Sequence, residues 1–292
     1  MGTMASRPNR WLEYLRLMRF NKPIGTLLHL WPMLWALWIA AEGVPRVDLL
    51  VIFFLGNFLM RSAGCVINDY ADRDLDGHVA RTRDRPLAAG TVTPREALIL
   101  FFVLLALAAS LLLFLNMLTF RIACAGAVLT IIYPFMKRYT YLPQVVLAAA
   151  LALSVPMAFA ATLDALPELA FVVYLATLLS AMVHDTIYAM VDRDDDIRIG
   201  IKSTAILFGE SDRFFIGVFQ VLLLITLIIM GVKAELGWIY YLGVLAAAAI
   251  GGRQQLLILD REAEDCFRAF KLTNLQSIAI LVGIVVDYRL AM

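Results

Sequence analysis

The sequence contains few charged residues and few cysteines. Charged side chains make up 17% of its 292 residues and hydrophobic ones 62%, and the mean hydropathy is +0.80. This composition excludes an ordinary soluble domain. The three cysteines, Cys65, Cys124 and Cys266, are too far apart for a paired zinc motif or a disulfide framework. We therefore expect the protein to reside in a lipid bilayer.

No hydrophilic stretch is long enough to form a separate soluble domain, so we expect one membrane-embedded domain over residues 1–292. Residues 1–22 lack the apolar core and small-residue cleavage site of a signal peptide. They combine Trp11 and Tyr14 with Arg16 and Arg19. This mixture predicts an amphipathic helix at the membrane interface.

Long apolar runs recur along the whole chain. Each is long enough to cross the hydrocarbon core as a helix, whereas the strands of a membrane barrel would be shorter and alternating. The runs lie at residues 23–41, 49–67, 97–115, 118–135, 142–162, 167–187, 214–232, 236–252 and 272–290. The sequence thus predicts an all-α integral membrane protein with nine transmembrane helices.

The distribution of basic residues predicts the orientation of these helices. Of the 25 Lys and Arg residues, only Arg46, Arg121, Lys233 and Arg289 fall on the side opposite the N-terminus. Because basic loops stay in the cytoplasm, the N-terminus is expected to be cytoplasmic and the C-terminus outside. The formal net charge of +1 hides this polarity, and no nucleic-acid partner is expected.

Two acidic clusters stand out in this apolar chain. In the first, Asn68, Asp72 and Asp76 are spaced four residues apart and would share one face of a continuing helix, with Asp69 beside them. Arg61, seven residues before Asn68, falls on nearly the same stripe. The second cluster steps by three, four and four residues along one face, and its members are Asp185, Tyr188, Asp192 and Asp196. An offset of 120 residues places Asp72 on Asp192, so two pseudo-repeats are expected, at about residues 1–140 and 141–292.

The chemistry of the clusters favours a divalent cation. Carboxylates one helical turn apart repel each other by about 3 kcal/mol at ~6 Å and an effective dielectric constant of ~20, so they require a neutralising partner or raised pKa values. The clusters supply oxygen ligands without His or Cys, which favours Mg²⁺ over zinc or a redox metal. Since Mg²⁺ commonly binds carboxylates together with substrate phosphates, the clusters predict a diphosphate held between them.

Basic residues follow both clusters and suit a phosphate-rich ligand. Arg81, Arg83 and Arg85 follow the first cluster, and Arg198 and Lys202 follow the second. Tyr133 and Lys137 stand one turn apart where a span meets the cytoplasm, with Arg138 next to them. Solvated loop acids and basic residues that only set topology are the alternative interpretation, but it does not explain two clusters at helical spacing.

Four segments resemble the membrane-embedded aromatic prenyltransferases of the UbiA type. They are MRFNKPIGTLLHLWPMLWALW, GCVINDYADRDLDGHVARTRDRPLAAG, YPFMKRYTYLPQVVL and DTIYAMVDRDDDIRIGIKSTAILFG. Within that superfamily they look most like the 4-hydroxybenzoate polyprenyltransferases of ubiquinone synthesis. The resemblance implies nine helices around a central cavity in the bacterial inner membrane, with the active site at the cytoplasmic side. It also implies transfer of a polyprenyl group, octaprenyl as the first expectation, from its diphosphate to the ring carbon ortho to the hydroxyl of 4-hydroxybenzoate.

The resemblance assigns roles to individual residues. The family's first motif falls on Asn68, Asp72 and Asp76, and its second on Asp185, Asp192 and Asp196; these would hold Mg²⁺ and diphosphate. Its Tyr-x-x-x-Lys pair falls on Tyr133 and Lys137, near the diphosphate and the allylic carbon. Its arginine falls on Arg61, which would bind the carboxylate of the aromatic acid. Asp69, Tyr188, Arg138 and Lys202 are further candidates for substrate binding.

Other functions remain open at this stage. A family member with a different aromatic acceptor would keep similar acidic motifs. A membrane transporter could use intramembrane acids, although inverted repeats are typical there and parallel ones are expected here. A CDP-alcohol phosphotransferase signature begins at Asp76 but fails at Pro94 and Leu98, where it needs Asp. Asp185, Asp192 and the diphosphate itself are the candidates for the base that takes the ring proton.

Overall fold

The computed structural model describes residues 9–78 and 82–291, and within them it contains helices and connections but no strand. The prediction of an all-α fold is therefore confirmed. The α-helices are α1 Arg10–Leu17, α2 Ile24–Ala40, α3 Val47–Asp72, α4 Pro94–Leu111, α5 Met117–Tyr139, α6 Pro143–Ala152, α7 Ser154–Leu163, α8 Glu168–Ile199, α9 Thr204–Phe208, α10 Asp212–Lys233, α11 Trp238–Leu257 and α12 Ala263–Ala291. Three short 3₁₀ helices are η1 Asp76–His78, η2 Leu112–Phe114 and η3 Gly209–Ser211.

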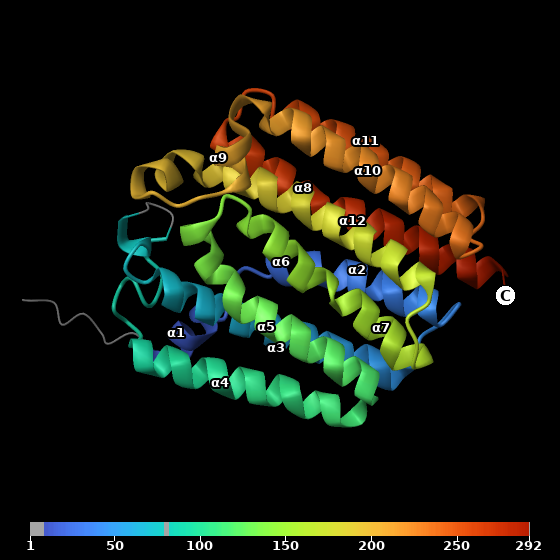
Figure 1. Ribbon diagram of the computed structural model, residues 1–292, viewed down its shortest axis with the longest axis horizontal. Helices are drawn as coiled ribbons and strands as arrows, with labels where there is room; N and C mark the ends of the chain where they lie inside the picture. The colour runs from blue at the N-terminus through green and yellow to red at the C-terminus, as the bar shows by residue number, and fades with distance from the viewer. Residues whose placement is uncertain (1–8, 79–81, 292) are drawn as a thin grey trace, which may run out of the picture.

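The long helices form an elongated bundle (Figure 1), and the contacts between its inner helices close a ring. Successive contacts run from α2 to α3, α5, α6, α8, α12 and back to α2. Outside this ring, α4 packs on α3, and α10 and α11 cover α8 and α12. Helices α1 and α9 and the connection between α3 and α4 gather at one end of the bundle (Figure 1). That end carries both acidic clusters.

Seven segments in the described part of the chain are long and apolar enough to cross a membrane. They are Val47–Asp72, Pro94–Phe114, Met117–Met136, Pro143–Leu163, Glu168–Ile199, Thr204–Lys233 and Ala263–Leu290. Helix α2 is apolar but has 17 residues, and α11 corresponds to the remaining predicted run without belonging to this set. The protein is thus a helical membrane protein with several apolar spans.

The predicted run at 142–162 is divided in the structure. Helix α6 ends at Ala152 and α7 begins at Ser154, with Leu153 between them. Pro156 lacks the amide hydrogen that a continuous helix would donate to the carbonyl of Ala152, and its ring opposes a straight helix at that point. The break lets α7 lean onto α2 while α6 packs against α8.

Close packing of α11 on α12 depends on small residues. A Cβ added at Gly243 would lie 2.6 Å from the carbonyl oxygen of Ala279, and one at Gly283 would lie 3.2 Å from the backbone of Tyr240. Small residues allow such close approach of helices in membranes, where no hydrophobic force drives helices together. This pair of helices therefore has little room for larger side chains.

Within the predicted interfacial segment 1–22, residues Arg10–Leu17 form helix α1, which begins at the Asn9 cap; residues 1–8 lie outside the described part of the chain. Its outer side exposes Trp11, Leu12 and Leu15, while Leu17 is fully buried. This apolar face is unpaired within the described residues and suits the boundary of a bilayer. The other side of α1 contacts the connection that follows α3, near the acidic clusters.

Candidate active site

The first acidic cluster lies at the end of α3 and in the turn that follows. Asn68 and Asp72 lie one turn apart on α3, which ends at Asp72, and Asp76 begins the separate helix η1. The expected continuous helix through Asp76 is therefore wrong. Carboxylates in the last turn oppose the helix dipole, and no basic residue lies in that turn. The chain turns instead, yet Asp76 still reaches the same cavity as Asn68 and Asp72.

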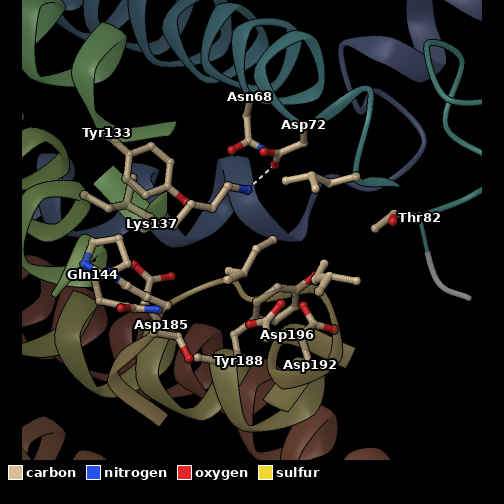
Figure 2. A pocket seen from close by; sticks show the side chains of 18 of the residues that line it. Asn68, Asp72, Thr82, Tyr133, Lys137, Gln144, Asp185, Tyr188, Asp192 and Asp196 are labelled. Atoms are coloured by element: carbon tan, nitrogen blue, oxygen red, sulfur yellow. Dashed lines mark hydrogen bonds and ion pairs between the residues drawn. The ribbon is translucent and has the colours of Figure 1, made fainter. Parts of the chain in front are cut away.

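The second cluster lies on α8, which extends 32 residues from Glu168 to Ile199. Its length keeps Asp185, Tyr188, Asp192 and Asp196 on one continuous helix, so the predicted shared face is present. Figure 2 shows these four side chains opposite Asn68 and Asp72, across the cavity. Two segments separated by more than 100 residues in sequence thus face one another.

The cavity between the clusters contains most of the residues expected in the site. Among those expected, it is lined by Asn68, Asp72, Asp76, Tyr133, Lys137, Asp185, Tyr188, Asp192, Asp196 and Lys202. Tyr133 and Lys137 come from α5 and point into it beside the first cluster (Figure 2). Lys202 approaches after Gly200, whose φ of 74° ends α8 in the left-handed conformation that glycine adopts readily. The turn is held by a hydrogen bond of 3.0 Å from the Lys202 amide to the Lys137 carbonyl.

Two buried carboxylate oxygens in this cavity have no hydrogen-bond partner among the described residues. The Lys137 ammonium donates to Oδ2 of Asp72, whereas Oδ1 of Asp72 is unpartnered. Oδ2 of Asp185 is likewise buried and unpartnered. Leaving such atoms unpaired costs free energy, and an unsatisfied buried oxygen often marks a place where a ligand or ion binds. The two oxygens lie on opposite sides of the cavity.

Arg85 supplies the main positive charge beside the first cluster. Its Nη1 donates to Asp76 Oδ1 at 3.0 Å and Oδ2 at 2.9 Å, and it lies 3.1 Å from Asp69 Oδ1. Burial raises the pKa of Asp76 above the usual range for a carboxyl group, although Arg85 opposes this shift. Burial alone would lower the pKa of Arg85, but Asp69 and Asp76 together raise it. Arg81 lies outside the described residues, and Arg83 is exposed.

Three expected residues lie outside the lining of this cavity: Asp69, Arg138 and Arg61. Asp69 follows Asn68 by one residue, which turns its side chain by about 100° around the helix, and it pairs with arginines. Arg138 turns away from Lys137 for the same reason, and its Nη2 donates to the Ala71 carbonyl at 2.5 Å. Arg61 packs against Gly25, where any Cβ would overlap its guanidinium group. In this position the positive charge of Arg61 is close enough to Tyr133 and Asp185 to interact with them electrostatically.

Gln144, Thr82 and Ser203 also line the cavity and were not predicted from the sequence. The side-chain oxygen of Gln144 accepts from the Thr204 amide at 3.1 Å, and the Thr82 hydroxyl donates to the Asp76 carbonyl at 2.8 Å. A lone amide at the start of an apolar run is the only signal that could have indicated Gln144. Thr82 and Ser203 carry no spacing signal, because turns bring them to the site.

The residues of the cavity fit a divalent cation that is shared with a ligand. No group of three or more His, Cys, Asp or Glu side chains in residues 9–78 and 82–291 is close enough to hold a metal ion by itself. The donors are carboxylate and amide oxygens, of the kind that Mg²⁺ prefers, and Mg²⁺ usually completes its shell with water and phosphate. A site that is divided between two sides of the cavity, with an unpartnered oxygen on each, is consistent with this coordination preference.

Comparison with known proteins identifies the family. Residues 29–278, which make up most of the chain, match the UbiA prenyltransferase family. The chain belongs to the UbiA prenyltransferase family. The UbiA resemblance inferred from the sequence is thereby confirmed, and the matched range includes both acidic clusters.

Relatives in the UbiA family are similar over nearly the whole chain. A protein of Aeromonas hydrophila named 4-hydroxybenzoate octaprenyltransferase is 53% identical over 279 residues, which cover 96% of this chain and 97% of that protein. A protein of the same name from Alkalilimnicola ehrlichii is 52% identical over 284 residues, covering 97% of each.

Solved UbiA structures share the fold. A UbiA homologue from Aeropyrum pernix K1 superposes with a TM-score of 0.79 at 22% identity, covering 90% of this chain and 98% of that one. A homologue from Archaeoglobus fulgidus bound to GPP and Mg²⁺ gives a TM-score of 0.72 at 19% identity, covering 94% and 99%. At these identities the likeness concerns the arrangement of the helices.

Proposed function

We propose that this protein transfers a polyprenyl group from a polyprenyl diphosphate to the ring carbon ortho to the hydroxyl of 4-hydroxybenzoate. Diphosphate is released, and the product serves ubiquinone biosynthesis. Two acidic clusters that face each other across one cavity carry this proposal (Figure 2). Family membership and the name shared by relatives more than 50% identical supply the substrates, with octaprenyl as the donor chain.

The proposed cofactor is Mg²⁺, held by Asn68, Asp72 and Asp76 on one side and by Asp192 and Asp196 on the other. Bound Mg²⁺ would neutralise the diphosphate and stabilise the charge that grows on it as the allylic carbon–oxygen bond breaks. The Mg²⁺ and GPP bound to the Archaeoglobus fulgidus homologue are consistent with this assignment.

Basic residues around the cavity would bind the departing diphosphate. Lys137, Lys202 and Arg85 approach it from three different segments of the chain. Charges fixed in position before the reaction need no reorganisation when negative charge develops, which is the condition for electrostatic stabilisation of a transition state. The ring of Tyr133 lies among these groups and can shelter the allyl cation through its π-face.

The acceptor would lie deeper in the bundle, between Arg61 and α8. We assign the carboxylate of 4-hydroxybenzoate to Arg61, whose guanidinium group has no hydrogen bond or ion pair to a residue of the described ranges and can form two parallel hydrogen bonds with a carboxylate. The unpartnered Oδ2 of Asp185 is an available base for the ring proton. The apolar bundle around them would exclude water that could quench the cation.

The proposal includes nine membrane crossings with the N-terminus and the active site at the cytoplasmic side of the inner membrane. When the nine apolar runs are threaded back and forth across the bilayer, most Lys and Arg residues fall on the same side as the N-terminus. We also propose two parallel repeats, at about residues 1–140 and 141–292. Shifting α3 by 120 residues gives 167–192, close to the start of α8 at Glu168, and shifting α4 gives 214–231, within α10.

An in vitro assay tests the proposed reaction. Purified protein with Mg²⁺, octaprenyl diphosphate and 4-hydroxybenzoate should form 3-octaprenyl-4-hydroxybenzoate, detected by mass spectrometry, and chelation with EDTA should stop the reaction. Asp72→Ala is the negative control, because it removes a proposed metal ligand and the partner of Lys137.

The acceptor is tested in the same assay with a panel of other aromatic compounds. A different acceptor that reacts while 4-hydroxybenzoate does not would make the protein a UbiA-family enzyme of another specificity. Absence of transfer to every acceptor, with binding of the diphosphate retained, would instead favour the transport function that the sequence left open.

A further inference from the structure

Asp69 lies in a chain of alternating charges beside the cavity. Arg19 Nη2 donates to Asp69 Oδ1 at 2.7 Å and to Oδ2 at 2.9 Å. Asp69 Oδ1 also lies 3.1 Å from Arg85 Nη1, and that nitrogen bonds both carboxylate oxygens of Asp76. The Asp69 side chain is 1% exposed. One buried carboxylate therefore links an arginine that precedes the first span to an arginine that lines the site.

Arg19 has a backbone conformation that is unfavourable for a residue with a side chain. Its φ is 60°, in the left-handed region, just after α1 ends. Glycine is typical of that position, whereas a residue with a Cβ is less stable there by roughly 1 kcal/mol or more. Here the unfavourable conformation belongs to a residue that makes two charge-assisted hydrogen bonds to Asp69.

Helix α1 also holds the connection that carries Arg85. Arg16 Nη2 donates to the Asp84 carbonyl at 3.1 Å, and the Thr91 hydroxyl donates to Glu13 Oε2 at 2.5 Å. Within the connection, the Arg85 amide bonds the Thr82 carbonyl at 2.9 Å. The connection is thus fixed to α1 on both sides of Arg85.

We propose that Arg19 and Asp69 are positioning residues that hold Arg85 at the diphosphate site. This inference rests on the proposed function. A carboxylate that binds a metal ion can no longer serve Arg85 fully, so the Arg85–Asp76 pair weakens when substrate arrives. Asp69 keeps its own pairing and retains Arg85 beside the cavity, ready to bind a phosphate oxygen. Through Arg19, the docking of α1 on the bundle sets the affinity for the prenyl diphosphate.

Binding measurements on the full-length protein in nanodiscs test this assignment. The probe is geranyl diphosphate with Mg²⁺, measured by isothermal titration calorimetry without acceptor. Asp69→Asn should raise the Kd about tenfold or more, because two guanidinium groups lose the charge between them. Arg19→Gln and Arg19→Gly should each raise it about three- to tenfold. The KM for 4-hydroxybenzoate should stay within about twofold of the wild type, given that its proposed site lies elsewhere.

Arg19→Gly separates positioning from the shape of the backbone. Glycine relieves the left-handed conformation, so a purely structural role for residue 19 predicts unchanged binding and an equal or higher melting temperature. The matched control is Asp74→Asn, which removes the exposed carboxylate of an ion pair with Arg73 next to the same cluster. This variant should leave the Kd unchanged.

A double-mutant cycle completes the test. If Arg19 acts through Asp69, the variant that combines Arg19→Gln with Asp69→Asn should bind about as weakly as Asp69→Asn alone. The inference would be overturned if the two substitutions multiplied each other's effects on the Kd, or if Asp69→Asn bound the diphosphate as tightly as the wild type. Either result would leave the proposed reaction intact. If the wild-type protein itself binds no diphosphate, the proposed function fails. Ligand-free melting temperatures identify any variant that is simply unfolded, and the other variants then decide the question.

Discussion

At the residue scale, the negative charge of Asp72 is stabilised by Lys137 before any ligand binds. One carboxylate oxygen accepts from Lys137, and the other is buried and unpartnered among the described residues. The pair keeps the negative charge compensated before any ligand binds, since an uncompensated buried charge would be costly. An arriving cation therefore meets an oxygen that is already oriented.

Arg61 carries the residue-scale prediction on the acceptor. Arg61→Ala should raise the KM for 4-hydroxybenzoate about tenfold or more, because a charge-assisted, two-pronged contact with its carboxylate is lost. The affinity for geranyl diphosphate should change little. Steady-state kinetics and calorimetry measure the two quantities separately.

Arg61→Lys refines that prediction. Lysine keeps the charge but lacks the planar fork, so an intermediate KM is expected. Arg46→Ala is the matched control, because Arg46 is exposed and pairs with Asp48 at the other end of α3. A loss of diphosphate affinity at unchanged acceptor KM would contradict the assignment of Arg61.

Sequence spacing predicted the residues on one helical face and was less informative about their neighbours. Asn68 and Asp72 share a face of α3 because four residues make about one turn, and they line the cavity together. Asp69 was expected beside them, but its pairing with Arg19 depends on how α1 folds back. Spacing within one helix contains no information about a partner that lies 50 residues earlier.

At the element scale, apolar length indicated which segments are helices, but it did not indicate where helices end or break. The run at 142–162 contains a break after Ala152, and α3 ends before Asp76. Pro156 was a visible signal for the first change. The turn after Asp72 brings Asp76 to its ion pair with Arg85, a tertiary contact that hydropathy does not record.

The contact between α11 and α12 gives a prediction at the element scale. Gly243→Ala should lower the stability by about 1–3 kcal/mol, because the added methyl group would overlap the backbone of Ala279, which cannot rotate away. The melting temperature of the purified protein in detergent should fall by several degrees.

Gly252 provides the matched control on the same helix. A Cβ there meets nothing within 4 Å. Gly252→Ala should therefore leave the stability unchanged or raise it by about 0.5–1 kcal/mol, since alanine favours the helix. Equal effects of the two substitutions would show that the contact between α11 and α12 leaves room for a methyl group at residue 243.

At the scale of the whole molecule, the proposed orientation can be tested by labelling. In a variant whose three cysteines are replaced by serine, Ala165→Cys lies between α7 and α8 and Asp260→Cys between α11 and α12, at opposite ends of the bundle. A membrane-impermeant maleimide added to intact cells should label residue 165 and not residue 260, because basic loops remain inside.

Permeabilised cells are the control for that experiment, because both cysteines should then react. Both positions are exposed, so a lack of reaction cannot be attributed to burial. Labelling of residue 260 in intact cells would reverse the orientation and place the acidic clusters outside.

The ring arrangement was expected only through the family resemblance. Hydropathy gives spans without saying which of them touch, and contacts such as α12 with α2 join the two ends of the chain. The offset of 120 residues between the clusters was the one sequence signal that two distant segments serve one site. It could not indicate that α5 would supply Tyr133 and Lys137 between them.

The closure of the ring by α12 has a consequence for biosynthesis. α12 contacts both α2 and α8, and it follows α2 by more than 200 residues in the chain. Until it enters the bilayer, the buried face of α2, including the fully enclosed Trp35 that bonds the Ser277 carbonyl, has no partner on that side. The nascent protein must therefore keep α2 sheltered by lipid or by the insertion machinery until α12 has been synthesised and inserted.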